Sequence, residues 1–404
     1  MTQRQILLAE QTITQEDLRE LIQWLETNPW LTQGPLVREF EDQWSCWLGT
    51  RYTTYVNSGS SADLLMYSAL LASGRLKNKR VVVPAVSWAT TVAPAIQLGF
   101  EPIMCEADWH TFGVDLNHLE DLLKQHGPAA VIVVHVLGVP NDMEGLLDLK
   151  ERYGFMLMED ACASTGSRYD GRPVGTFGDL SAFSAFYGHH ISTIEGGMVC
   201  TSDEELHDLL LHLRSHGWAK DVARDKEERQ ARAHGALEFN RPFTFYYPGF
   251  NFRSTDLNAR IGLSQLKRIN NVVERRIENH KIYQSRFLDA GFHCQTTQRG
   301  TICSISFSAL ADSMEHRERI GAALRAHDIE TRPLGGGNMS RQPFWADRYG
   351  SAVFPVADRI HTTSFQLPNH PRLTPEDIDF VCGVVLSVPR ETAAAPLAAG
   401  TRGV

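Results

Sequence analysis

Between residues 53 and 205, short apolar runs rich in β-branched residues alternate with longer segments whose apolar residues recur at helical spacing. Two helical segments, Leu116–His126 and Met143–Tyr153, stop before Gly127 and Gly154, the residue type that commonly ends a helix. Strands are predicted for residues 80–83, 102–105, 130–134, 155–158, 181–184 and 198–200. This alternation predicts an α/β fold with a mostly parallel, mixed sheet.

The pattern changes after residue 255. A long amphipathic helix is predicted from residue 256 to about 288, followed by strands at 293–296 and 302–307 and helices at 315–327 and from Thr374 onward. We therefore expect an N-terminal segment and large domain over residues 1–260, a linking helix and small α+β domain over 261–390, and a disordered tail over 391–404. The polar stretch 220–235 is expected to form a mobile insertion over the site.

Composition excludes several classes of protein. The chain has 404 residues, 43% of them hydrophobic, and a net charge of −9 with both signs interspersed, so nothing suggests binding to nucleic acid or to an anionic membrane. The N-terminus lacks a signal peptide, and His135 interrupts the longest apolar stretch, which predicts a cytoplasmic protein. The seven cysteines are scattered without a Cys-x-x-Cys pair, which argues against disulfides, a metal site or an iron–sulfur cluster.

Two short segments have the composition of a phosphate site. Gly59 and Ser60 lie in a Gly/Ser run that opens an apolar helix expected over residues 63–71, where free backbone N–H groups and the helix dipole favour an anion. A second hydroxyl, Ser184, ends a later strand. The same Gly/Ser pattern also occurs in ordinary helix caps, so it does not by itself establish a phosphate site.

An acidic and an aromatic residue also follow predicted strands. Glu159-Asp160 follows the run 155–158, and a buried carboxylate there requires a cationic partner such as a pyridinium nitrogen. The alternative is that Asp160 caps the following turn. Trp88 lies just past another strand and either stacks on a heteroaromatic ring or fills the core.

Three further residues have both a chemical and a structural interpretation. Asn251 either donates to a phosphate or forms a turn before the helix that follows. His216 either handles protons at the site or caps a helix C-terminus. His189, with His190 beside it, is an acid/base candidate near neutral pH, a solvated turn residue or a metal ligand, although no second ligand stands at metal-binding spacing.

The order of these segments is more specific than any one of them. From about residue 30 to residue 390 the chain resembles the DegT/DnrJ/EryC1/StrS family of sugar aminotransferases, which have the fold type I architecture of aspartate aminotransferase and depend on pyridoxal phosphate (PLP). The segments that carry the resemblance are residues 34–41, the loop 58–61, Trp88, residues 134–138, Glu159-Asp160, residues 175–180, Glu195-Gly196-Gly197 and Asn251.

The resemblance has one departure. The family's lysine, which binds the cofactor covalently, stands six residues before the Glu-Gly-Gly motif, and here that residue is His189. An imidazole forms no stable imine but exchanges protons. The chain is thus similar to the lysine-less branch that removes the C3 hydroxyl from GDP-4-keto-6-deoxy-D-mannose. The lysine-less branch that works with an iron–sulfur reductase has a cysteine cluster where residues 219–239 have none, so no such partner is expected.

The resemblance implies a role for each candidate. His189 would be the catalytic base and His216 would assist it. Asp160 would pair with the pyridine nitrogen, Trp88 would stack on the ring, and Gly59, Ser60 and Ser184 would hold the phosphate. Asn251 would reach the phosphate from the second subunit of a homodimer. The expected reaction is 3-dehydration of a nucleotide-linked 4-keto-6-deoxyhexose with L-glutamate restoring the pyridoxamine form (PMP); the alternatives are the same dehydration, or a transamination, on another keto sugar, and a non-catalytic cofactor-binding homologue.

Overall fold

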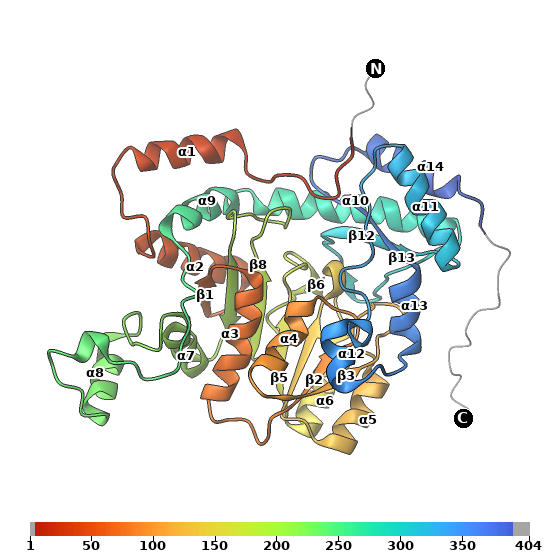
Figure 1. Ribbon diagram of the computed structural model, residues 1–404. Coiled ribbons are helices and arrows are strands. Elements are labelled where there is room, and N and C mark those ends of the chain that lie inside the picture. The colour runs from red at the N-terminus through yellow and green to blue at the C-terminus, as the bar shows by residue number, and fades with distance from the viewer. Residues whose placement is uncertain (1–4, 391–404) are drawn as a thin grey trace.

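A computed structural model describes residues 5–390 of the chain (Figure 1). Its centre is a seven-stranded mixed sheet in the order β1-β9-β8-β5-β4-β2-β3. The strands are β1 (Tyr52–Val56), β2 (Arg80–Pro84), β3 (Glu101–Cys105), β4 (Ala130–Val134), β5 (Met156–Asp160), β8 (Leu180–Ser184) and β9 (Gly197–Thr201). Neighbours from β3 through β8 are parallel, and β9 is antiparallel to both β8 and β1. The α/β prediction with a mostly parallel sheet is confirmed.

Alternating strand residues pack against helices on the two faces of this sheet. Val81 and Val83 pack in a cluster with α3 (Gly59–Ala72), α4 (Ala89–Gln97) and α7 (Glu204–Arg214), whereas Val82 packs with α5 (Leu116–His126) and α6 (Met143–Tyr153). Helices α5 and α6 have the predicted bounds. Both are followed by a left-handed glycine, Gly127 and Gly154. Since both faces are covered, the central strand β4 is apolar throughout, and β2 is apolar after Arg80.

A second, antiparallel sheet lies in the C-terminal part of the chain. Its strands are β10 (His293–Cys294), β12 (Ser306–Leu310) and β13 (Ser364–Pro368), and they pack with α10 (Ile269–Asp289), α11 (Met314–Ala326) and α14 (Pro375–Leu386) around a separate apolar cluster. Ile6 of the N-terminal segment belongs to the same cluster. In Figure 1, α10 runs alongside β12 and β13. The predicted tail, residues 391–404, lies outside the described residues.

The remaining described elements border these two sheets. Helices α1 (Gln15–Leu25) and α2 (Pro35–Leu48) precede the large sheet, and α12 (Pro343–Tyr349) and α13 (Pro355–Thr363) precede β13. A small ribbon pairs β11 (Gly300–Thr301) with β6 (Arg168–Tyr169), which pairs with β7 (Arg172–Pro173). No helix between residues 5 and 390 has both the length and the apolar character needed to cross a bilayer.

Several predicted boundaries differ from the structure. The single helix from 256 to 288 is wrong: α9 (Asp256–Leu266) ends and α10 begins on either side of Lys267 and Arg268. Arg268 leaves helical geometry, and its guanidinium bonds Asp17 at 2.5 and 2.6 Å, a tertiary contact without a local sequence signal. The strand predicted at 302–307 begins only at Ser306, because the Cys303 carbonyl accepts from His190 and the Ile305 amide donates to Leu137.

Four other boundaries shift less. The helix expected from residue 63 already begins at Gly59, and the strand expected at 155–158 spans Met156–Asp160. β10 covers only the first two residues of the predicted strand 293–296, and α11 spans Met314–Ala326 in place of 315–327. The polar stretch expected over the site carries helix α8 (Arg224–Ala233), which Figure 1 shows at the periphery, away from strands β2 to β5.

Helix α2 is capped by a carboxylate from a distant part of the chain. Its N-cap residue, Gly34, has no side chain to accept the first N–H groups. Asp256, at the start of α9, accepts from the amides of Gly34, Leu36 and Val37 at 2.8, 3.2 and 3.0 Å. This buried carboxylate therefore fixes α2 to α9 beneath β1.

We predict that Asp256→Ala lowers the free energy of unfolding by roughly 2 kcal/mol, because it removes a buried charged cap from three helix N-terminal amides. Urea unfolding of the full chain measures the change. Asp42→Ala, at an exposed position of the same helix, is the matched control and should change stability by less than about 0.5 kcal/mol. Equal effects of the two substitutions would contradict the capping role.

Candidate active site

The predicted site residues lie at one edge of the large sheet. Because β1, β2, β5 and β8 run in the same direction, their carboxyl ends meet at this edge. Asp160 and Ser184 are the last residues of β5 and β8. Gly59 and Ser60 begin the helix after β1, and Trp88 is the N-cap of the helix after β2. The carboxyl edge of a parallel sheet is the usual ligand-binding edge of α/β folds.

The first turn of α3 and the end of β8 are in close contact. Ser58 caps the helix by accepting from the Ser61 amide, which leaves the Gly59 and Ser60 amides in the uncapped first turn. A Cβ atom added to Gly59 would stand 2.8 Å from the Ser184 Cβ and 3.0 Å from the Cys162 Sγ. The approach of α3 to β8 therefore requires glycine, and it brings the first turn of α3 next to the Ser184 hydroxyl. The Ser60 hydroxyl in the same turn donates to the Thr90 hydroxyl of α4 at 3.0 Å.

Asp160 is 4% exposed, and its carboxylate accepts two hydrogen bonds. The Thr91 hydroxyl donates to Oδ2 at 2.6 Å, and the Cys162 amide donates to Oδ1 at 3.0 Å. The second bond is the turn cap that the sequence offered as an alternative. Within residues 5–390 no basic side chain forms an ion pair with Asp160. A buried carboxylate without a counter-ion is costly, so the site fits a cationic ring nitrogen as its partner.

The neighbouring Glu159 has a structural role. It accepts from the amides of Gly175, Phe177 and Gly178 at 2.7, 2.7 and 2.5 Å, and from His135 at 3.0 Å. Burial opposes ionisation of Glu159, but His135 and the amides outweigh it and lower the pKa of the carboxyl. Three of the motifs noted in the sequence thus form one hydrogen-bond network around Glu159, near the end of β5. They are the segments 134–138, 159–160 and 175–180.

His189 follows β8 in a turn whose backbone is held by the His189 amide, which donates to the Phe186 carbonyl at 3.1 Å. The imidazole is partly buried, and its Nδ1 has no hydrogen-bond partner among the described residues. His190 points elsewhere: it is buried, and its Nε2 donates to the Cys303 carbonyl at 3.0 Å. The Nδ1 of His190 also lacks a partner among the described residues, but that ring is buried and held through Nε2, so the partly exposed His189 is the more accessible of the two histidines.

A buried arginine holds the His189 turn. Arg276 of α10 donates to the carbonyls of Gly188 and His189 at 3.3 and 3.4 Å, and to those of Ile305 and Asn369 near the small sheet. No carboxylate pairs with this guanidinium within the described part of the chain, and burial lowers its pKa to about 10. Burial, and then the charge of Arg276, lower the pKa of His189 to about 4. His189 is therefore unprotonated at neutral pH.

His216 and Asn251 lie together on a segment next to the α3 loop. The residues Ser215 and Asn251 form a β-bridge, and the His216 amide donates to the Phe250 carbonyl at 2.6 Å. The Asn57 amide donates to the Phe252 carbonyl, which ties this segment to the loop before Gly59. His216 has a left-handed backbone, φ 59°, directly after the C-cap residue of α7, and the next amide, that of Gly217, donates to the His212 carbonyl at 2.8 Å, so His216 occupies the helix-capping position that the sequence offered as an alternative. Asn251 is exposed, and its reach to a second subunit stays a prediction.

Four residues at the site were not predicted from the sequence. Thr91 orients Asp160, Asp63 lies beside Asp160, Arg276 holds the His189 turn, and Arg253 has a buried Nη1 without a partner next to Val56. Asp63 is the first residue of the helix predicted over 63–71, Thr91 is three residues after Trp88, and Arg253 is two residues after Asn251. Arg276 has no local signal, because its partners are 29 to 93 residues away in the chain.

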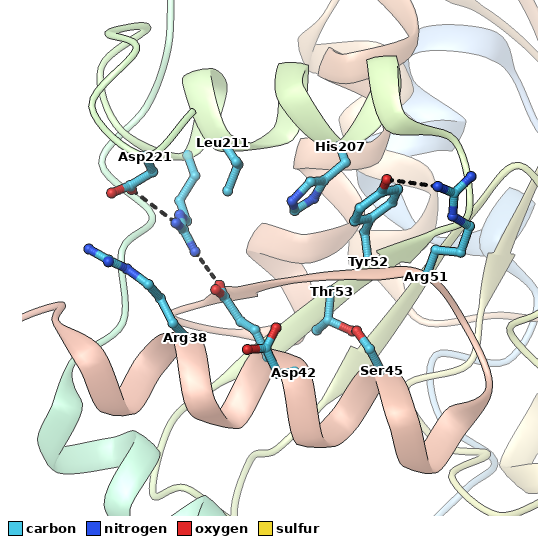
Figure 2. Close-up of a pocket in the computed structure, with 11 residues that line it drawn as sticks. Arg38, Asp42, Ser45, Arg51, Tyr52, Thr53, His207, Leu211 and Asp221 are labelled. Atoms are coloured by element: carbon cyan, nitrogen blue, oxygen red, sulfur yellow. Dashed lines mark hydrogen bonds and ion pairs between the residues drawn. The ribbon is translucent and has the colours of Figure 1, made fainter. Parts of the chain in front are cut away.

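A polar pocket between α2 and α7 lies at the opposite end of β1 and shares no residue with the predicted site (Figure 2). Arg214 crosses it between Glu41 and Asp221, at 2.5 and 3.0 Å. Glu41 also accepts from the Tyr55 amide, and Arg214 donates to the Tyr55 carbonyl. The network thus supports β1, which leads into the Gly59 loop.

Comparison with known proteins identifies the family. Residues 11–386 match the model of the DegT/DnrJ/EryC1/StrS aminotransferase family. The chain belongs to this family. It is 33% identical over 338 residues to the GDP-4-keto-6-deoxy-D-mannose 3-dehydratase of Yersinia pseudotuberculosis, covering 82% of this chain and 85% of that protein.

Two solved structures of GDP-4-keto-6-deoxymannose-3-dehydratase have the same fold. A mutant form with bound GDP-perosamine superposes with a TM-score of 0.86 and 28% identity, covering 95% of this chain and 100% of that one. A form with a trapped PLP-glutamate geminal diamine has a TM-score of 0.84 and 28% identity, covering 94% and 99%. The prediction of the PLP-dependent fold type I architecture is confirmed.

We predict that His189 titrates near pH 4, well below the ordinary value of about 6.5. Because burial depresses the pKa, the imidazole is neutral above pH 5 and gains a proton only as the pH falls toward 4. NMR chemical shifts of the histidine ring, assigned by comparison with His189→Asn, measure this titration. Exposed His110 is the internal reference. Protonation of His189 near pH 6.5 would contradict the prediction.

Proposed function

We propose that this protein is a PLP/PMP-dependent 3-dehydratase of a nucleotide-linked 4-keto-6-deoxyhexose, with GDP-4-keto-6-deoxy-D-mannose as the substrate. The observation that carries the proposal is that an unprotonated His189 occupies the position of the family's lysine. The other residues that the family uses at the carboxyl ends of the strands are present. The family membership and the similarity to GDP-4-keto-6-deoxy-D-mannose 3-dehydratases support it.

The chain's residues fit the cofactor. Asp160 is a buried carboxylate that lacks a counter-ion among the described residues, and a protonated pyridine nitrogen supplies one. The first turn of α3 at Gly59 and Ser60, with the Ser184 hydroxyl, provides donors for a phosphate. Trp88 is 57% exposed at the same edge, so its indole face is free to stack on a ring.

Bound as pyridoxamine phosphate, the cofactor supplies a primary amine for the C4 ketone of the sugar and a ring that accepts electrons. Neutral His189 takes a proton from the C4′ carbon of the cofactor and returns one to the departing C3 hydroxyl. Asp160 keeps the ring nitrogen protonated. Arg276 holds the turn that carries His189. His216 assists substrate binding or proton transfer. L-Glutamate is the amino donor that restores the amine form.

We also propose that the active unit is a homodimer with shared sites. Large apolar side chains stand exposed around the His189 turn, with Phe186, Tyr187 and Ile194 each 43 to 49% exposed. A cluster of this kind next to a ligand site favours cover by another chain. Asn251, exposed close to the Gly59 loop, would then donate to the phosphate held by the partner subunit.

Transamination of a keto sugar is the second candidate, because the family is one of aminotransferases. It requires a base and an amino donor but no loss of the C3 hydroxyl. The absence of a lysine at position 189 favours dehydration, since no side chain amine is available there to displace the product before the hydroxyl leaves.

We predict that purified protein with PMP, glutamate and GDP-4-keto-6-deoxy-D-mannose releases ammonia and a 3-deoxy sugar. His189→Asn should reduce this rate by at least about 100-fold, because the amide is not a base. His189→Lys should reduce it comparably and direct product toward a 4-amino sugar. CDP-, dTDP- and UDP-linked analogues test the nucleotide. Undiminished dehydration by either variant would exclude His189 as the base.

We further predict that the wild-type protein holds PLP noncovalently. Its eight lysines are Lys77, Lys79, Lys124, Lys150, Lys220, Lys226, Lys267 and Lys281, and none occupies the family's anchoring position. Borohydride treatment of the PLP-loaded wild type should therefore leave the protein mass unchanged. His189→Lys, treated in the same way, should gain one cofactor mass at residue 189. A cofactor adduct on any wild-type lysine would overturn the prediction.

A further inference from the structure

A second carboxyl group, that of Asp63 on α3, lies at the carboxyl edge of the large sheet, close to Asp160. Gly59, Asp63 and Tyr67 follow at intervals of four residues, so they lie on the same side of the helix. Gly59 contacts Ser184 and Cys162, and the Tyr67 hydroxyl donates to the Thr91 carbonyl at 3.0 Å. Between them, the carboxyl oxygens of Asp63 and Asp160 and the Cys162 Sγ lie within 4.8 Å of one another.

Asp63 is 2% exposed, and its Oδ1 has no hydrogen-bond partner among the described residues. The groups that face it are Asp160 of β5, Cys162 after that strand, and Tyr67 on its own helix, none of them a cation. Burial, and then the charge of Asp160, raise the pKa of Asp63 well above its ordinary value. Two ionised carboxylates this close in a buried place repel one another, and a single ring cation could neutralise only one of them.

We propose that Asp63 is a positioning residue of the cofactor site that remains un-ionised and donates its proton toward the Asp160 carboxylate. The pair then carries one proton and one negative charge. Asp160 already accepts from Thr91 and Cys162, and a third donor would hold the remaining charge where the ring nitrogen binds. This inference rests on the proposed use of Asp160 as the partner of that nitrogen.

Two substitutions separate a proton donor from an ionised carboxylate. Asp63→Asn is neutral and nearly isosteric, and its amide still donates. Asp63→Leu has similar volume and no donor. If Asp63 acts as an un-ionised donor, Asp63→Asn should bind PLP within about threefold of the wild type, while Asp63→Leu should bind roughly tenfold more weakly. Quenching of intrinsic tryptophan fluorescence by added PLP measures both affinities.

A second readout uses the full chain without cofactor. The infrared difference spectrum of wild type minus Asp63→Asn at pH 7 should contain the C=O stretching band of an un-ionised carboxylic acid, with the small downshift in D₂O that such a group shows. This band does not depend on PLP. If Asp63→Leu fails to fold, the band and the affinity of Asp63→Asn still decide the question.

Absence of the band would overturn the proposal because it means that Asp63 is ionised. An Asp63→Asn variant that binds PLP as weakly as Asp160→Asn would also overturn it, because a neutral donor would then fail to replace Asp63. Failure of the proposed function would give a different binding result. In that case the wild type and Asp160→Asn would bind PLP equally or not at all, whatever the infrared spectrum shows for Asp63.

Discussion

The site is organised around a carboxylate that the chain buries at a strand end without a counter-ion of its own. Asp160 accepts two hydrogen bonds, from Thr91 and Cys162, but within residues 5–390 no basic side chain pairs with it. Such an arrangement is stable only if the charge is neutralised or solvated some other way. The neighbouring elements follow from this constraint: Glu159 fixes the strand end through the 175–178 loop, α4 supplies Thr91, and α3 supplies Gly59 and Asp63.

A second constraint governs His189, the proposed base. An imidazole serves as a base only when it is unprotonated, and the fold ensures this by burial and by placing the cationic Arg276 against the same turn. Arg276 comes from α10 and also bonds carbonyls at Ile305 and Asn369. The position of His189 therefore depends on the small sheet as well as on β8. A change in the packing of α10 would therefore shift His189, although Arg276 and His189 are 87 residues apart in the chain.

The sequence predicted those helices and strands whose bounds depend on residues close by in the chain. The bounds of α5 and α6 follow from apolar spacing and a terminal glycine, and the buried strands β2 and β4 follow from unbroken β-branched runs. The order of the motifs was sufficient to predict the family. It was also sufficient to locate the residues from Gly59 to His189 that lie at or after the carboxyl ends of the strands. The break at Arg268, the late start of β12, and the roles of Arg276 and Asp63 were missed because each depends on a partner far away in the sequence.

Replacing a lysine by a histidine also changes the charge balance of this site. A lysine at position 189 would be a second cation beside Arg276, in a place where burial already opposes positive charge. Neutral His189 avoids that conflict and keeps its proton-accepting nitrogen. At the other end of the site the pair Asp63 and Asp160 needs only one positive charge, which the ring nitrogen supplies if Asp63 keeps its proton. In this proposal the histidine and the un-ionised carboxyl each remove one buried charge, because neutral His189 avoids a second cation beside Arg276 and protonated Asp63 avoids a second anion beside Asp160.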